Sequence, residues 1–168
     1  MRTLLIGILV GMALVLAAEY LFFTQGGMPV ATRGGPLPLE RFLTSRALNV
    51  AVEKERGLSS PVVADEANLV AGAKVYRALC AVCHGRPQET LPSPIGRGMF
   101  PRPPPLMPPD KGVTDDLVGE THWKVKNGIR LTGMPSFEAT LSEKEMWQVS
   151  LLLLEANHLP AGALHELQ

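Results

Sequence analysis

Five consecutive residues, Cys80-Ala81-Val82-Cys83-His84, carry the clearest chemistry in this sequence. The spacing C-x-x-C-H is typical of the covalent attachment of a c-type haem. Two intervening residues let both sulfurs reach the two vinyl groups on one side of the porphyrin, and His84 then turns its imidazole toward the iron. These cysteines are the only two in the chain, so no thiol is left for a structural disulfide. The segment predicts one covalently bound haem c.

Two other interpretations of the cysteine pair are less favoured. A zinc site needs four ligands, usually with a second Cys/His pair at similar spacing, and the remaining histidines, His122, His158 and His165, form no such pair. A thioredoxin-like dithiol follows a strand in a βαβ pattern, whereas the residues before Cys80 predict an amphipathic helix. Zinc binding and dithiol redox chemistry therefore stay as minor alternatives.

A second segment, residues 129–137, offers a sixth ligand for the iron. Met134 lies between Gly133 and Pro135, and the proline excludes a helix there. A thioether on a loop that faces His84 would complete octahedral iron, and a His/Met ligand pair raises the redox potential relative to other axial sets. Met134 is therefore the predicted second metal ligand, beside His84.

The other methionines are weaker candidates for this role. Met99 and Met107 lie on a proline-rich loop and stay as minor rivals. Met146 lies on a predicted helix and is expected in the core. The rest belong to the N-terminal segment and the linker that follows it, namely Met1, Met12 and Met28.

The attachment motif is expected at the end of a helix that spans Asp65 to Ala81. Within it, Gly72, Tyr76 and Cys80 recur at every fourth residue and so share one face. A glycine in the middle of a helix costs about 1 kcal/mol relative to alanine, which another helix approaching closely at Gly72 would offset. Tyr76 is expected to fill that crossing and to cover the haem edge, as part of the cofactor-binding set.

Residues 85–109 are rich in proline, which excludes helix and most sheet pairing. We therefore expect an irregular loop that walls one side of the haem at low entropic cost. Arg97 and Arg102 lie on this loop and are candidates to pair with the haem propionates. Solvated surface arginines are an equally good interpretation of both residues.

Two more helices are expected after the loop. The first spans Thr114 to Asn127 and is capped by its first residue; the second spans Leu141 to Asn157 and opens with a capping box. His122, on the first of them, has no loop to position it as a ligand and is expected at the surface or beside the metal ligands. The residues after Leu159 predict a short, poorly ordered tail.

The N-terminus predicts a membrane anchor. The run from Leu4 to Phe23 is almost entirely apolar, and about 20 apolar residues cross a bilayer as a helix. The alternative is a cleaved signal peptide with Val15-Leu16-Ala17 as its cleavage site. Because the apolar run continues beyond that point, an uncleaved anchor over residues 1–24 is favoured.

Residues 25–64 predict a Gly/Pro-rich linker that contains a short amphipathic helix at 39–56. We expect this helix to pack on the domain that follows, with the membrane surface and a partner protein as alternative contacts. Its apolar stripe consists of Leu39, Phe42, Leu43, Ala47, Val50 and Ala51.

The charge balance excludes nucleic acid as a partner. The chain has 16 Lys and Arg residues against 16 Asp and Glu residues, whereas nucleic-acid binding needs a basic face.

Residues 65–168 are expected to form one all-α haem domain of three to four helices.

Residues 68–157 resemble a class I c-type cytochrome. The resemblance rests on the order of the parts: the Gly72/Tyr76 helix leading into the attachment motif, a wrapping loop, a middle helix, the Gly-Met134-Pro loop and a C-terminal helix with Trp147. The anchor and the long proline-rich loop look more like the membrane-tethered monohaem cytochromes of bacterial respiratory or photosynthetic complexes. The resemblance implies haem c, ligation by His84 and Met134, and a position on the periplasmic side of the bacterial inner membrane.

The resemblance also implies one-electron transfer with redox partner proteins or within a larger membrane complex. Two strong axial ligands leave the iron no open position, so the expected protein is an electron carrier and not an enzyme. A haem enzyme or sensor with a displaceable Met134 is one alternative, and a subunit whose haem is purely structural is another. Neutral charge and a possible docking helix favour a fixed subunit slightly over a tethered mobile carrier.

Overall fold

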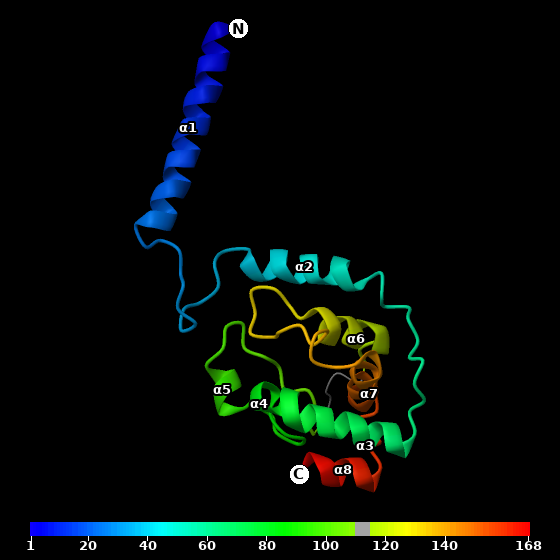
Figure 1. Ribbon diagram of the computed structural model, residues 1–168. Coiled ribbons are helices and arrows are strands. Elements are labelled where there is room, and N and C mark those ends of the chain that lie inside the picture. The colour runs from blue at the N-terminus through cyan, green and yellow to red at the C-terminus, as the bar shows by residue number, and fades with distance from the viewer. Residues whose placement is uncertain (110–114) are drawn as a thin grey trace. The chain divides into compact units, whose positions relative to one another are not determined.

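The computed structural model describes residues 1–109 and 115–168, and all regular structure within those ranges is helical. The all-α prediction is therefore confirmed. The chain divides into two compact units, residues 1–38 and residues 39–168, and each is described by itself below (Figure 1). The predicted boundaries of the anchor, linker and haem domain, at 24/25 and 64/65, stay a prediction.

The first unit contains one long helix, α1 (Arg2–Thr24). An 18-residue window of this 23-residue helix has a mean hydropathy of 2.3, and none of its side chains is buried. At about 1.5 Å per residue a helix of this length covers the hydrocarbon core of a bilayer. By length and composition, α1 is a candidate membrane span.

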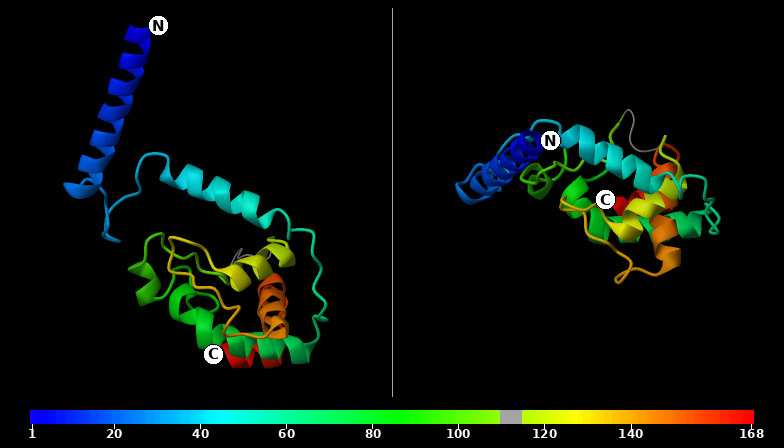
Figure 2. Two further views of the ribbon diagram at one scale, coloured as in Figure 1. Left: turned by 45° about the horizontal axis from the view of Figure 1, so that its top comes forward. Right: turned by 90° about the horizontal axis from the view of Figure 1, so that it is seen from above.

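The second unit is a set of short helices around the crossing of α3 and α7 (Figures 1 and 2). α8 packs against α3, and α6 packs against α7 and against α2. The buried side chains include Leu69, Ala73, Val149 and Leu152. The helices are α2 (Glu40–Val52), α3 (Glu66–Val75), the π-helix η1 (Tyr76–Cys80), α4 (Ala81–His84), α5 (Pro94–Arg97), α6 (Val118–Asn127), α7 (Glu143–Leu154) and α8 (Ala161–Leu167).

Gly72 is the point of closest approach between α3 and α7, as the sequence predicts. A Cβ atom at this position would overlap the backbone carbonyl of Gln148 and would lie 3.2 Å from Cβ of Leu152. Because the obstacle is backbone, a side chain at residue 72 cannot be accommodated by a rotamer change. The missing side chain thus lets the two central helices cross in contact.

Replacing Gly72 with alanine is expected to lower the free energy of unfolding by about 1–3 kcal/mol, the usual cost of overpacking a core. Denaturant unfolding of the full chain in detergent measures it. Gly57→Ala is the matched control, because nothing lies within 4 Å of a Cβ at that position. Equal stability of the two variants would show that α3 and α7 do not meet at Gly72.

The start of the middle helix and the C-terminal tail both differ from the sequence prediction. α6 begins at Val118, and Asp116 does not cap it but pairs with Lys124 at 3.1 Å. The predicted cap, Thr114, lies outside the described residues. The predicted disordered tail is wrong, because α8 forms there and buries Ala163 and Leu167. A short apolar helix docking on α3 was not visible as a pattern in so few residues.

The face by which α2 packs is also not the predicted one. Val52 is fully buried and Leu48 is half-buried, and both lie on the side of α2 opposite the predicted apolar stripe. The stripe from Leu39 to Ala51 is exposed. Periodicity found the apolar face, but only tertiary packing decides which face of a two-sided helix meets the domain.

His122 lies in the interior of the second unit and not at its surface. Only 3% of the residue is exposed, and its ring stacks on Trp147 with centroids 3.8 Å apart. Its Nε2 lies 3.0 Å from a carboxylate oxygen of Glu143, although neither ring nitrogen has an aligned hydrogen bond. Burial lowers the pKa of His122, and the nearby Glu143 carboxylate opposes this without reversing it.

The depressed pKa of His122 makes stability depend on pH. Below about pH 6.5 the unfolded chain takes up a proton at this ring and the folded chain does not, so stability is full above that pH and falls as the pH is lowered. His122→Phe keeps a flat ring beside Trp147 but cannot titrate. Unfolding at pH 7 and pH 5 should therefore show a smaller loss for His122→Phe than for the wild type, and equal losses would contradict the assignment.

Candidate functional site

The attachment motif spans two kinds of helix. Cys80 ends the π-helix η1, and Cys83 and His84 lie in the single turn of α4. Both cysteines are unpaired and half-buried. The turn ends at Gly85 with φ +87° and ψ −178°, a conformation open almost only to glycine. π-turns inside helices occur frequently at functional sites, and here the π-turn leads directly into the motif.

The electrostatics of Cys80 differ from those of a reactive redox thiol. Burial, followed by the neighbouring Cys83, raises the pKa of Cys80 to about 12. Reactive dithiols instead have a thiol pKa lowered by a helix N-terminus or a nearby cation. Among the described residues no three His, Cys, Asp or Glu side chains gather as a metal site.

The imidazole of His84 is oriented by the proline-rich loop. Its Nδ1 lies 2.7 Å from the backbone carbonyl of Pro104. A carbonyl only accepts, so Nδ1 carries the proton and donates it, and Nε2 keeps the lone pair that a metal requires. Burial lowers the pKa of His84, with the Pro104 carbonyl acting in the opposite direction, so the ring is held in the neutral form that binds metals.

Ser93 joins the loop to the attachment motif from the other side. Its hydroxyl donates to the carbonyl of Val82 at 2.5 Å and accepts from the amide of Gly96 at 3.0 Å, which caps α5. Its own amide donates to the carbonyl of Cys83 at 3.2 Å. α5 was not predicted, although Ser93-Pro94 has the N-cap and N1 residues that begin a helix. The loop is therefore fixed to the motif.

Tyr76 is 1% exposed and closes the inner side of the motif. Its hydroxyl donates to the carbonyl of Gly85 at 2.9 Å. Burial raises the pKa of Tyr76 well above its usual range, so the phenol keeps its proton and acts as the donor. The Tyr76 hydroxyl thus holds Gly85, the residue that follows His84; the predicted contact of Tyr76 with the haem edge stays a prediction.

Replacing Tyr76 with phenylalanine is expected to lower the free energy of unfolding by about 1–3 kcal/mol, because the buried Gly85 carbonyl loses its partner. Thermal unfolding of the purified chain measures this. The chain's other tyrosine, Tyr20, is 68% exposed in α1, and Tyr20→Phe is the matched control. A destabilisation no larger than the control's would mean that this hydrogen bond does not hold the turn.

Met134 lies on a loop that is folded back on the end of α6. Its amide donates to the hydroxyl of Thr132 at 3.1 Å, and its carbonyl accepts from the amide of Ile129 at 3.2 Å. The loop then returns alongside α6, where the Ser136 hydroxyl donates to the carbonyl of Lys126 at 2.6 Å. Met134 itself is half-buried against the core, so its thioether is held by a well-bonded loop.

The structure distinguishes the rival methionines by their burial and by their position relative to the Met134 loop. Met107 and Met146 are buried in the core cluster. Met99 is half-buried, and its terminal methyl lies where a Cβ of Gly133 would be. Met99 therefore lies against the Met134 loop and is the one rival that the structure keeps near it. The choice of Met134 as a ligand stays a prediction.

Arg97 and Arg102, the two arginines predicted to pair with the propionates, are exposed. Nη1 of Arg97 donates weakly to the carbonyl of Pro92 at 3.5 Å. Arg102 lies five residues further along the same loop. Their predicted contact with propionates stays a prediction, and the interpretation as solvated arginines stays open beside it.

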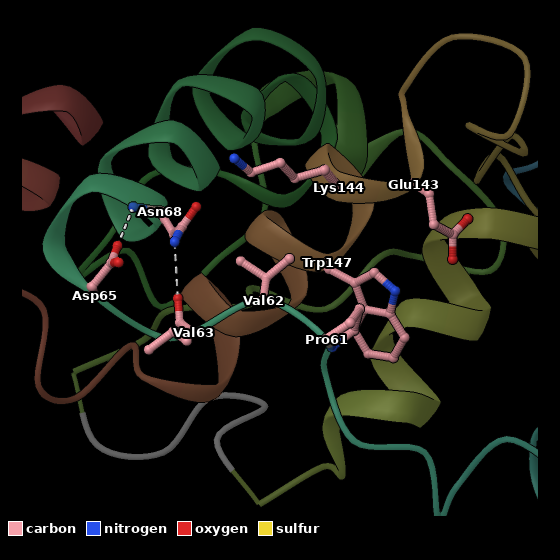
Figure 3. Close-up of a pocket in the computed structure, with 8 residues that line it drawn as sticks. All are labelled: Pro61, Val62, Val63, Asp65, Asn68, Glu143, Lys144 and Trp147. Atoms are coloured by element: carbon pink, nitrogen blue, oxygen red, sulfur yellow. Dashed lines mark hydrogen bonds between the residues drawn. The ribbon is translucent and has the colours of Figure 1, made fainter.

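A surface groove of about 470 Å³ lies away from the attachment motif, where α3 and α7 begin (Figure 3). It is lined by Pro61, Val62, Val63, Asp65, Asn68, Glu143, Lys144 and Trp147. Asp65 accepts from the amide of Asn68 at 2.8 Å, and the Asn68 side chain donates to the carbonyl of Val63 at 3.1 Å. These polar groups serve to cap α3, and the groove contains none of the predicted site residues.

Comparison with known proteins gives one finding. The model of the family described as cytochrome C oxidase, cbb3-type, subunit III matches residues 67–151, half of the chain. The matched segment contains the attachment motif, the proline-rich loop and the Met134 loop. Searches of curated proteins and of solved structures found no match.

Proposed function

Because this chain belongs to the cbb3-type cytochrome c oxidase subunit III family, a family of class I c-type cytochromes, we propose that it is a membrane-anchored monohaem cytochrome. The family implies electron transfer through haem c and a non-catalytic, membrane-associated role. Our proposal adds that one haem is bound covalently by Cys80 and Cys83 and ligated by His84 and Met134. It also adds that α1 crosses the bacterial inner membrane, with the haem domain on the periplasmic side.

The observation that carries this proposal is the hydrogen bond from His84 Nδ1 to the Pro104 carbonyl. Histidines that bind metals usually donate their second nitrogen to a carbonyl or carboxylate, which sets both the tautomer and the ring orientation. The ring is thus prepared as a ligand next to two unpaired thiols. When bound, the haem supplies a reversible one-electron couple.

The residues of the site would hold the haem in place and would not themselves react. Tyr76 and Ser93 fix the turn of the attachment motif from two sides. The bonds within the Met134 loop hold its thioether, the proposed second iron ligand beside His84, in a defined place. A site held on both sides changes little between oxidation states, which favours electron transfer.

We further propose that the protein works as a fixed subunit of a membrane oxidase complex. The family is one of oxidase subunits, and the balanced charge gives no strongly basic docking face. Detergent-solubilised membranes should then yield this chain together with other subunits. A free monomer that reduces an oxidase at a collision-limited rate would contradict this part of the proposal.

The visible spectrum of the purified protein, oxidised and reduced, with and without carbon monoxide, tests the function. We expect a low-spin haem that resists acid extraction, a far-red sulfur-to-iron band and no response to carbon monoxide. A high-spin spectrum, or one that carbon monoxide changes, would indicate an open iron position and would favour a haem enzyme or sensor. A His/Met spectrum without oxidation during turnover would favour a structural haem.

A further inference from the structure

α2 is attached firmly to the haem unit at its C-terminal end. Val52 is fully buried, and the turn after it meets α6 so closely that a Cβ at Gly119 would overlap the carbonyl of Glu55. Arg56 adds an ion pair with Glu120 at 3.1 Å. α2 therefore moves with the haem unit, beside α6, and is not a flexible part of the linker (Figure 2).

The opposite face of α2 is apolar and exposed. At about 100° per residue, Leu43 and Val50 lie along one line of α2, with Phe42 beside them, and Leu39 is the N-cap of the helix. Leu43 and Val50 are each 59% exposed, Phe42 is 68% exposed and Leu39 is 70% exposed. Single exposed apolar residues are ordinary, but a contiguous stripe on a rigid helix indicates a surface that is covered by something.

The tether limits what can cover this stripe. Fourteen residues, 25–38, separate the end of α1 from Leu39. A flexible chain of that length has a root-mean-square reach of about 20 Å, so the stripe stays close to any membrane that α1 crosses. Tethering gives the stripe a local concentration at the membrane of order mM. Even a weak affinity for the membrane surface is then sufficient for the stripe to stay bound.

The charges near the stripe fit an anionic membrane surface. At about 100° per residue, Arg46 lies within the stripe, between Phe42 and Val50, whereas Arg41 lies on the packed side with Leu48. Arg33 lies in the tether, and the stretch from residue 25 to Val52 has one acidic residue, Glu40. Glu53, just after the last residue of the helix, pairs with Arg56 at 3.1 Å. An arginine within an apolar stripe can extend its guanidinium to the headgroups while its methylene stem stays on the apolar side.

We propose that the exposed face of α2, formed by Leu39, Phe42, Leu43 and Val50, lies in the headgroup region of an anionic bilayer. With α1 this gives the haem unit two attachments to one membrane, so the unit keeps one orientation toward it. Interfacial helices of this kind bury a Phe/Leu face and use basic residues toward anionic lipids. The inference rests on α1 crossing the membrane and not on the ligands of the haem.

The test places a tryptophan on either side of α2 in the full-length haem-loaded protein. Phe42→Trp reports the proposed lipid face, and Thr44→Trp is the matched control, because it is exposed and lies on the opposite side of the helix. Each variant is reconstituted in nanodiscs of zwitterionic and anionic phospholipid with brominated acyl chains, which quench nearby indoles. The wild type in the same discs supplies the background from Trp123 and Trp147.

We expect brominated lipid to quench the Phe42→Trp signal at least twofold more than the Thr44→Trp signal, and the difference to shrink in discs without anionic lipid. Equal quenching of the two probes would overturn the proposal. A blue-shifted Phe42→Trp that brominated lipid does not quench would also overturn it and would indicate a protein partner. Since the haem spectrum is read on the same samples, a normal spectrum without quenching refutes only the lipid contact.

Discussion

Replacing Cys80 and Cys83 together with alanine is expected to reduce covalently bound haem from one per chain to none. The two residues are the only thiols in the chain, so no other side chain can form a thioether. Both are unpaired and half-buried at the end of η1 and in α4. Haem staining after denaturing electrophoresis measures the loss, with acid extraction as a second assay.

The single variants serve as controls for this experiment. Cys80→Ala and Cys83→Ala each keep one thiol, and each should retain some haem through a single thioether. His84 and its bond to Pro104 are untouched in all three variants, so any loss reports attachment and not ligation. Haem that survives denaturation in the double variant would disprove covalent attachment at these residues. A wild-type chain that carries zinc or a Cys80–Cys83 disulfide in place of haem would restore the alternatives.

The parts of this protein that the sequence predicts well are those encoded within a few residues. The attachment motif occupies five positions, and the capping box of α7 four. The close approach at Gly72 follows from one glycine in an otherwise regular helix, and the structure places α7 there. Local patterns are informative because helix periodicity and capping depend on neighbours in the chain.

The parts that could not be predicted depend on contacts between distant segments. The acceptor for His84 is a backbone carbonyl, at Pro104, and any residue type would supply one. The packing face of α2 is decided by α6, where Gly119, far away in sequence, meets the carbonyl of Glu55 just after α2. The position of Met99 against Gly133 likewise arises from two loops that meet only in the folded chain. These contacts carry no signal in local composition or periodicity.

Met134→Ala is expected to convert the iron from a low-spin to a high-spin, carbon-monoxide-binding state. Loss of the thioether removes the far-red sulfur-to-iron band, because no sulfur then faces His84 across the iron. The midpoint potential should fall by roughly 0.1–0.3 V, within the ~0.8 V over which axial ligands set haem potentials, since His/Met ligation raises it. Visible spectra and a redox titration measure both effects.

Met99→Ala is the control that decides between the two methionines of this region. Its side chain lies against Gly133, so it is the residue best placed to replace Met134, and on our assignment its removal alone leaves the far-red band unchanged. A band that persists in Met134→Ala but disappears in the double variant would show that Met99 takes over the iron when Met134 is absent. A band lost in Met99→Ala and kept in Met134→Ala would make Met99 the native ligand. The proline-rich loop, which meets the Met134 loop at Gly133, would then supply the sixth ligand of the iron. Met134 would in that case be a core residue.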